Sequence, residues 1–259
     1  MTDLAVKDVP GGGAKAVRVS GMFYALACYA VGMAAIAGLA AFAFNVPVPR
    51  AVDIGPSGPA SLALGVDLLL IALFGVQHSV MARPRFKAWL TRFVPAPLER
   101  ATYVLATALV IVPILFFWRP LPGELFSVTH ETLRAALWGL AAVGWVIVVV
   151  STFLIDHFEL FGLRQAWCWM RGREFVPPPF RIYSLYRLVR HPMQLGVLIA
   201  LWATPDMTVS RILFAGGFTL YVLVGLWHEE RGLVAHFGDR YRDYQAQVPF
   251  IVPGLKRRG

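Results

Sequence analysis

Six long apolar runs, separated by shorter polar connections, define the organisation of this chain. A helix needs about 20 predominantly apolar residues to cross the hydrocarbon core of a bilayer, and several of the runs reach that length. The pattern therefore predicts an all-α, polytopic membrane helix bundle. The expected helices cover residues 21–44, 62–81, 101–118, 133–155, 189–203 and 209–227.

The last two apolar runs are expected to form a helical hairpin. The fifth run is short, and residues 204–208, Thr-Pro-Asp-Met-Thr, join it to the sixth. Proline and aspartate are typical of turns, so the connection predicts a tight reversal. If the hairpin is counted as one re-entrant unit, the bundle has five spans. We prefer six helices, with both chain ends on the same side of the membrane.

Lysine and arginine fall almost entirely in alternate connections. Of 24 basic residues, three lie in residues 1–20, five in 83–100, six in 156–190 and six from position 229 onward. By the positive-inside rule, both termini and the two basic loops are expected in the cytoplasm. The four basic residues that lie elsewhere are Arg50, Arg119, Arg134 and Arg211.

The composition agrees with a membrane protein and limits its partners. Hydrophobic residues make up 58% of the 259 residues, and the mean hydropathy is +0.62, well above that of soluble domains. The net charge is +9, and the basic residues that produce it lie in alternate connections between the apolar runs. This distribution favours a lipid surface over nucleic acid as the partner. The histidines lie in separate segments without zinc spacing, so no metal is expected. The sequence leaves the oligomeric state open.

We expect a single membrane domain, 1–259, with three parts outside the bundle. Residues 1–20 are expected as a flexible cytoplasmic lead and 156–189 as a cytoplasmic connecting segment. Residues 190–249 then hold the last hairpin and a tail, in which 229–247 is expected to form one amphipathic interfacial helix. The apolar face of that helix is Leu233, Phe237, Tyr241 and Tyr244.

The segment RHPMQLG, from Arg190 to Gly196, places charged residues at the mouth of an apolar helix. Proline is favoured at the first helical position, so His191 is expected as the cap, with the next backbone amides free. Such an end, with Arg190 beside it, binds an anion. The alternative is that Arg190 and His191 only anchor the helix at the headgroup level.

Glu229 and Glu230 follow the last apolar run. At the end of a helix they face the negative pole of its dipole, and anionic headgroups lie nearby, so a compensating partner is expected. That partner is Arg190, Arg240, or the hydroxyls or cation of a ligand. The alternative is a plain interfacial salt bridge.

Two further polar pairs border the expected helices. Asp156-His157 follows the fourth run, and a histidine beside a carboxylate can act as a base; the alternative is an interfacial histidine satisfied by water. Gln77-His78 ends the second run and is expected to line the same space. Asp67, about 15 Å deeper at helical rise, is expected in a structural pair or near the outer interface.

The chain resembles the isoprenylcysteine carboxyl methyltransferase superfamily in an ordered set of motifs. RHPMQLG is followed about thirty residues later by HEERGLVAHFGDRYRDYQAQVP. This combination is similar to the carboxy-terminal signature of those integral membrane enzymes, which take a methyl group from S-adenosylmethionine. The chain departs from the family where an aromatic residue often stands at Met193 or Gln194.

The remaining motifs narrow the resemblance. QHSVMARPRFKAWL, LERATYVL and STFLIDHFELFGLRQ look like the bacterial branch that methylates methanethiol to dimethyl sulfide. The resemblance implies an enzyme of the bacterial inner membrane that transfers the methyl group in line to a thiolate at the cytoplasmic side. Alternatives are the same chemistry on a prenylcysteine carboxylate or an amine lipid headgroup, or a non-catalytic denitrification-associated membrane protein.

The resemblance also implies a division of roles. Since a thiol reacts as its thiolate, Asp156 and His157, with Arg190, are expected to accept the proton or stabilise the thiolate, and Gln77 and His78 to line the thiol pocket. Arginine and histidine suit the donor's methionyl carboxylate, a glutamate its ribose or ammonium, and a tyrosine its adenine. The residues expected to bind S-adenosylmethionine are Arg190, His191, Pro192, Gln194, Leu195, Gly196, Glu229, Glu230, Tyr241 and Tyr244.

Overall fold

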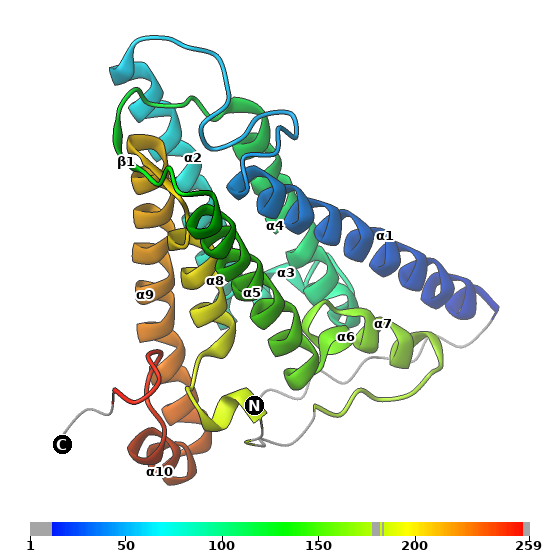
Figure 1. Ribbon diagram of the computed structural model, residues 1–259. Helices are drawn as coiled ribbons and strands as arrows, with labels where there is room; N and C mark the ends of the chain where they lie inside the picture. Colours follow the sequence, from blue (N-terminus) through cyan, green and yellow to red (C-terminus); the bar gives the residue numbers. More distant parts are fainter. Residues whose placement is uncertain (1–11, 178–181, 183, 256–259) are drawn as a thin grey trace.

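The protein is a bundle of long apolar helices. The computed structural model describes residues 12–177, 182 and 184–255. Within these residues five helices are long and apolar enough to cross a membrane, which confirms the all-α membrane fold (Figure 1). They are α1 (Gly12–Ala43), α2 (Ala60–Met81), α4 (Glu99–Phe117), α5 (Glu131–Ile155) and α9 (Val209–Phe237).

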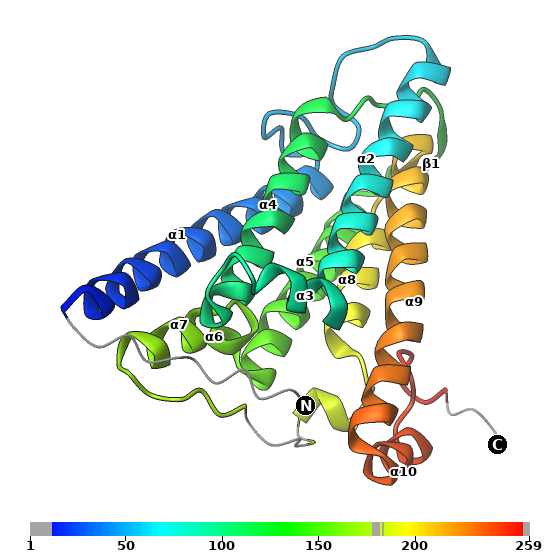
Figure 2. The same cartoon turned by 180° about the vertical axis from the view of Figure 1, so that it is seen from behind.

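Most short elements lie at the two ends of this bundle, whereas α8 lies within it beside α5 (Figure 1). The helices α3, α6, α7 and α10 lie at one end, whereas β1 lies at the other (Figures 1 and 2). Seen from behind, α2 runs between α4 and α9 (Figure 2). The short elements are α3 (Pro84–Leu90), η1 (Ala96–Leu98), β1 (Glu124–Ser127), α6 (His157–Leu160), α7 (Leu163–Met170), η2 (Ser184–Arg187), α8 (Pro192–Trp202), β2 (Asp206–Thr208) and α10 (Asp239–Gln247).

The first helix starts earlier than the apolar pattern predicts. It begins at Gly12, nine residues before position 21, and it packs against α4 and α7. Residues 12–20 of the expected flexible lead are therefore helical, and the remainder, 1–11, lies outside the described residues. The pattern missed these two and a half turns because Lys15 and Arg18 interrupt the apolar run, although basic side chains are compatible with the end of a membrane helix.

The last two helices form the expected hairpin, but their connection, residues 203–208, is an extended segment rather than a tight turn. The helix α8 has only 11 residues, about 16 Å at helical rise, which is too short to cross the hydrocarbon core. The last residue of α8, Trp202, donates from Nε1 to Thr219 Oγ1 at 2.9 Å, and Thr219 lies about a third of the way along α9. The chain then continues as an extended segment that leads to β2 rather than as a turn.

The extended segment pairs its backbone with the protein. β2 runs antiparallel to β1, and Pro205 O accepts from Val128 N at 2.9 Å. The residues from Ala203 to Pro205 and Met207 are buried. Non-helical backbone at membrane depth is tolerated only where protein covers it. β1 and Val128 provide this cover by hydrogen-bonding the backbone of the segment that follows α8.

The expected interfacial helix 229–247 is also wrong as a single element. The helix α9 continues ten residues past 227 to Phe237, and α10 starts at Asp239. Gly238 between them has φ 59° and ψ −134°, a conformation that is essentially restricted to glycine. The predicted apolar face survives the break, because Tyr241, Tyr244 and Val248 form a buried cluster with Leu233, Val234 and Phe237.

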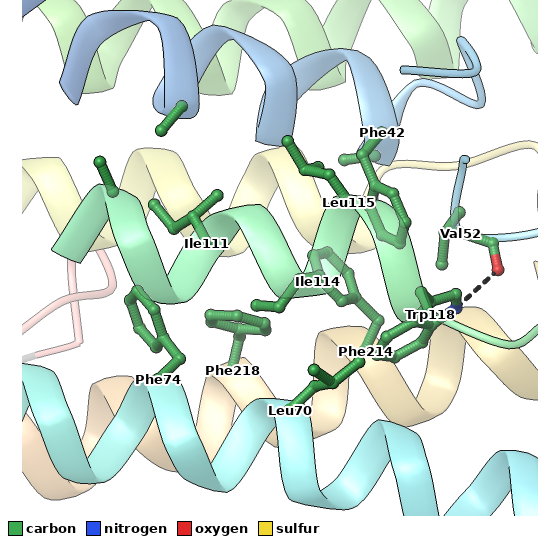
Figure 3. Close-up of a cluster of buried hydrophobic side chains, with 13 residues drawn as sticks. Phe42, Val52, Leu70, Phe74, Ile111, Ile114, Leu115, Trp118, Phe214 and Phe218 are labelled. Atoms are coloured by element: carbon green, nitrogen blue, oxygen red, sulfur yellow. Dashed lines mark hydrogen bonds between the residues drawn. The ribbon is translucent and has the colours of Figure 1, made fainter. Parts of the chain in front are cut away.

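The main hydrophobic core joins four helices. Figure 3 shows aromatic rings of α2 and α9 packed against aliphatic side chains of α4, with Phe42 of α1 at one edge. Trp118 is fully buried there and donates from Nε1 to Val52 O at 3.0 Å. This core holds α2, α4 and α9 together, which are the helices that carry the inner polar residues described below.

Arginines at the β1 end are held in structural pairs. Arg134 binds Asp206 through two hydrogen bonds of 2.6 and 2.8 Å, and Arg211 Nε donates to Asp53 at 2.7 Å. The Arg134 guanidinium lowers the pKa of Asp206. Asp67 lies near the same end, where its Oδ1 accepts from the backbone amide of Arg119 at 2.9 Å. Asp67 thus has the structural partner that its depth predicted.

Two glycines allow α5 and α8 to approach closely. A Cβ on Gly144 would lie 2.6 Å from Gly196 O and from Ala200 N, and a Cβ on Gly196 would lie 2.6 Å from Gly144 O. Small residues let helix backbones touch in this way within membranes. Gly196, expected at the donor site, instead packs the helix that carries His191 against α5.

We predict that Gly144→Ala lowers the thermal stability of the detergent-solubilised protein. The added methyl group meets backbone atoms of α8 that cannot rotate away, and such overpacking costs about 1–3 kcal/mol. Gly139→Ala, in the same helix, is the matched control because nothing lies within 4 Å of its Cβ. An equal fall in melting temperature for both variants would contradict the close contact.

Candidate functional site

A buried carboxylate organises the polar residues at the start of α8. Glu230 Oε1 lies 2.7 Å from His191 Nε2 and accepts from Tyr241 OH at 2.7 Å. Glu230 Oε2 lies 3.0 Å from Arg190 Nη2 and accepts from Gln245 Nε2 at 2.6 Å. We call these five residues the Glu230 cluster. The cluster brings together the RHP segment, the second glutamate and one tyrosine of the tail, as the sequence predicted.

Arg190 ties the entrance of α8 to the tail. Its Nη1 donates to Gln245 O at 2.9 Å and to Val248 O at 3.2 Å, and its backbone amide donates to Pro249 O at 2.9 Å. Its Nε is buried and has no hydrogen-bond partner among the described residues. The guanidinium is therefore largely committed to holding the fold, with one donor left for another group.

The start of α8 leaves two backbone amides available. Pro192 is the first helical residue, as expected. The Leu195 amide was also expected to be free, but it donates to His191 O at 3.0 Å, so that expectation is wrong. The amides of Met193 and Gln194 precede that first bond and have no partner inside the helix. His191 occupies the cap position, but its side chain is turned to Glu230 rather than to these amides.

The two tail tyrosines serve the packing of the tail. Tyr241 is 1% exposed and Tyr244 is 5% exposed, and the Tyr244 hydroxyl donates to Tyr186 O at 2.6 Å. Burial, and then the Glu230 carboxylate, raise the pKa of Tyr241, while burial raises the pKa of Tyr244 to about 12. Both phenols thus remain hydrogen-bond donors at physiological pH, and their buried rings are not open to an adenine.

Glu229 faces a different direction from Glu230. Its side chain is exposed, whereas that of Glu230 is 13% exposed. Glu229 interacts electrostatically with His191 and with Tyr221, which lies two turns earlier on α9. The adjacent glutamates therefore divide between two neighbouring spaces, one toward the tail and one toward α2.

A cavity of about 670 Å³ lies between α9 and the tail. Arg190 and Glu230 provide its charged wall, and Trp227 and Phe250 provide aromatic surface. Phe250 also contacts the cluster directly, with its ring 5.2 Å from that of His191 and 5.4 Å from the Arg190 guanidinium carbon. The volume is within the range of pockets that bind molecules of cofactor size.

Asp156 and His157 lie apart from this cluster. Asp156 accepts from the Glu159 amide at 3.0 Å, and its other oxygen pairs with Arg164. Among the described residues, no side-chain hydrogen bond or ion pair joins His157 to Asp156 or to the Glu230 cluster; His157 instead stacks on Phe153 at 4.3 Å. The carboxylate caps α6 rather than orienting the imidazole.

Both nitrogens of His157 already have partners. The hydroxyl of Thr152 lies 2.7 Å from Val149 O and 2.8 Å from His157 Nδ1; with its hydrogen directed to Val149 O, it accepts the Nδ1 hydrogen. His157 Nε2 then accepts from Tyr29 OH at 2.8 Å. Burial lowers the pKa of His157. The imidazole is a neutral, satisfied link between α1 and α5, which leaves it no free lone pair for a substrate proton.

His78 lies among aromatic rings of three helices. Its ring stacks on Phe74 at 5.3 Å, lies 4.9 Å from the ring of Tyr103 and meets Tyr221 edge to face at 5.9 Å. His78 Nδ1 is 3.2 Å from Thr107 Oγ1. Gln77, by contrast, donates to Met81 Sδ at 3.0 Å, and its Oε1 is buried without a hydrogen-bond partner.

Sequence reasoning missed several residues that complete these sites. Gln245 follows Tyr241 by four residues, so helical spacing alone would place both on one face of α10. Tyr29 and Thr107 gave no such signal, because their histidine partners lie in other helices, 128 and 29 residues away. Such partners become visible only when the helices are placed in space.

The sequence is similar to a known protein family and to individual enzymes over most of its length. Residues 68–252 match the NnrU protein family, which is more than half of the chain. The chain is 46% identical over 232 residues to a methanethiol S-methyltransferase of Mycobacterium tuberculosis, covering 90% of this chain and 95% of that one. It is also 46% identical over 243 residues to a methanethiol S-methyltransferase of Pseudomonas deceptionensis, covering 94% and 93%.

A more distant similarity extends to an animal protein. Nurim of Xenopus laevis is 33% identical over 167 residues, covering 61% of this chain and 58% of nurim. No solved structure matches the chain.

We predict that His157 makes the folded state sensitive to acid. Because burial lowers its pKa below the usual 6.5, its contribution to stability is present above that value and is lost as pH falls. Between pH 7 and pH 5 the melting temperature of the wild type should therefore fall more steeply than that of His157→Asn. Equal slopes for the two proteins would show that the imidazole is not held neutral.

Proposed function

The chain belongs to the NnrU protein family and groups with methanethiol S-methyltransferases, and on this premise we propose that it methylates methanethiol to dimethyl sulfide. The observation that carries the proposal is 46% identity over nearly the full length of two methanethiol S-methyltransferases. We propose S-adenosylmethionine as the methyl donor, since thiol methylation needs an electrophilic methyl group and the tail motifs resemble those of enzymes that use this donor. When bound, it supplies a methyl group on a sulfonium.

The Glu230 cluster and its cavity form the donor site of this proposal. The cavity has the volume for a nucleoside-sized ligand, and Arg190 Nε is a buried donor that still needs an acceptor. The free amides of Met193 and Gln194 add donors at a helix start, where a carboxylate is favoured. Glu229 does not line this cavity. It lies in the neighbouring space beside His191 and Tyr221, from which we assign it to the ammonium or the ribose hydroxyls of the donor, whereas Glu230 keeps Arg190 and His191 in place.

Aromatic surface suits the positive charge of the donor. Trp227 and Phe250 line the cavity, and a cation over an aromatic face is stabilised by about 0.5–2 kcal/mol. Arg231 already stacks on Trp227 at 3.6 Å, so Phe250 is the more available face. Tyr241 and Tyr244 were expected to contact the adenine of the donor. Because their rings are buried, we assign the aromatic contact with the donor to Phe250 and Trp227 instead.

The distribution of charge supports an orientation in the membrane. The Glu230 cluster, α3, α7 and α10 all lie in the connections that carry 20 of the 24 basic residues. The arginines of the β1 end are instead taken up in pairs such as Arg134 with Asp206. We therefore assign the donor site to the cytoplasmic side of a bacterial inner membrane.

The proposed reaction is tested with the purified protein, S-adenosylmethionine and methanethiol. We predict dimethyl sulfide in the headspace by gas chromatography, in proportion to S-adenosylhomocysteine in solution. Donor turnover on a prenylated cysteine or on lipid headgroups without dimethyl sulfide would overturn the substrate. Failure to bind the donor by calorimetry would overturn the enzyme class.

The donor site makes a separate prediction. Glu229→Gln should weaken the calorimetric affinity for S-adenosylmethionine by roughly ten- to a hundredfold, because a hydrogen bond to a charged group is worth about 1.5–3 kcal/mol. Glu230→Gln should weaken it as well and should also lower the melting temperature, since it leaves the Arg190 charge unpaired. Asp206→Asn, which breaks an ion pair near the β1 end, is the control and should bind the donor normally.

A further inference from the structure

The hydrogen bonds of Thr107 favour one tautomer of His78. Thr107 Oγ1 is placed to donate its one hydrogen to Tyr103 O at 2.9 Å. With the hydrogen directed there, the hydroxyl oxygen, 3.2 Å from His78 Nδ1, accepts from Nδ1, which carries the hydrogen in this tautomer. In the neutral imidazole this leaves the lone pair on Nε2. No described residue forms a hydrogen bond with that atom, and the side chain is partly exposed.

The other groups around His78 offer no competing base. Phe74 has no acceptor, and the phenols of Tyr103 and Tyr221 are protonated at neutral pH. The Tyr103 hydroxyl donates to His78 O at 3.2 Å. Among the described residues packed against this ring, the imidazole is the group with a nitrogen lone pair that can accept a proton.

The same hydrogen-bond logic separates His78 from His157. In each case a threonine hydroxyl is turned back to a helix carbonyl and accepts from Nδ1. His157 Nε2 is then occupied by Tyr29 OH, whereas His78 Nε2 is not occupied by any described residue. Of the two histidines near the inner ends of the helices, His78 is the one with an available lone pair.

The surroundings of His78 also match a small apolar thiol. Sulfur packs favourably against aromatic rings, with about 0.3–1.5 kcal/mol per contact, and three rings from α2, α4 and α9 surround this site. Tyr221 lies eight residues before Glu229 on α9, roughly 12 Å at helical rise. The three rings around His78, those of Phe74, Tyr103 and Tyr221, are thus about two helical turns along α9 from Glu229, which we assign to the donor.

We propose that His78 is the general base of the methyl transfer, an inference that rests on the proposed function. Nε2 accepts the proton of the thiol S–H, and the S–H electron pair remains on sulfur as the thiolate. The thiolate then forms a bond to the methyl carbon while the bond from that carbon to the donor sulfonium breaks, with its electron pair going to the departing sulfur. The imidazolium returns its proton to water after the neutral sulfide leaves.

The decisive comparison uses two thiols of nearly the same shape. Ethanethiol is weakly acidic, whereas 2,2,2-trifluoroethanethiol is acidic enough to reach the site as the thiolate without a base. In His78→Asn the side-chain amide can still donate to Thr107, but no base remains. We predict that kcat for ethanethiol and methanethiol falls by roughly a hundredfold or more, as expected for loss of a general base, while trifluoroethanethiol loses less than about tenfold.

The controls separate this inference from the proposed function. His130→Asn makes the same substitution at an exposed histidine at the start of α5 and should leave all three rates unchanged. The donor affinity of His78→Asn should equal that of the wild type. An equal loss for both ethanethiols, or no loss, would overturn the role of His78 even if the wild type makes dimethyl sulfide. A wild type that makes none would instead overturn the proposed function.

A second variant covers the case in which His78→Asn does not fold. Thr107→Val keeps the imidazole but removes the acceptor of its Nδ1 hydrogen. We expect a loss for ethanethiol of about tenfold, because the Nδ1 hydrogen loses its acceptor and the tautomer with a free Nε2 is no longer favoured, and a smaller loss for the trifluoro compound. No difference between the two thiols in this variant would contradict the proposal.

Discussion

The carboxylate of Glu230 is the constraint on which the inner half of this protein depends. It lies 21 residues into α9, roughly 30 Å at helical rise, which is about the depth at which a span leaves the hydrocarbon core. A carboxylate there is tolerated only if it is paired and hydrogen-bonded. Arg190, His191, Tyr241 and Gln245 meet that need, and in doing so they fix where α8 begins and where the tail folds back.

The unusual shape of α8 follows from this anchor. A helix that starts beside Glu230 and has 11 residues ends at the level of Thr219, well short of the other face. The chain must cover the remaining distance in an extended form, and an extended backbone needs partners in the membrane. β1 provides them, so the small sheet at one end is a structural consequence of a charged site at the other.

Sequence patterns predicted the parts of this structure that depend on solvent contact. The six apolar helices, the gathering of the basic connections at one end of the bundle and the meeting of Arg190 with Glu230 follow from apolar length and charge. The helix ends at Gly12 and Phe237 did not, because a membrane helix continues past its apolar part without a change in backbone geometry. The roles of Gly196 and Tyr241 were also missed, since close backbone contact and burial of a tail ring depend on which helices are neighbours.

The same limit explains why the sequence could not show which of His78 and His157 has a nitrogen available to accept a proton. Asp156 next to His157 looks like a catalytic dyad, but the backbone at Asp156, with φ 154°, turns the carboxylate to the α6 amides. Both histidines lie beside a threonine hydroxyl that also bonds a carbonyl of its own helix. They differ at Nε2, because the Tyr29 hydroxyl is bonded to His157 Nε2 and no described residue is bonded to His78 Nε2. A base for an apolar thiol can lie in an aromatic, weakly polar part of the bundle, apart from the charges that a cationic donor requires.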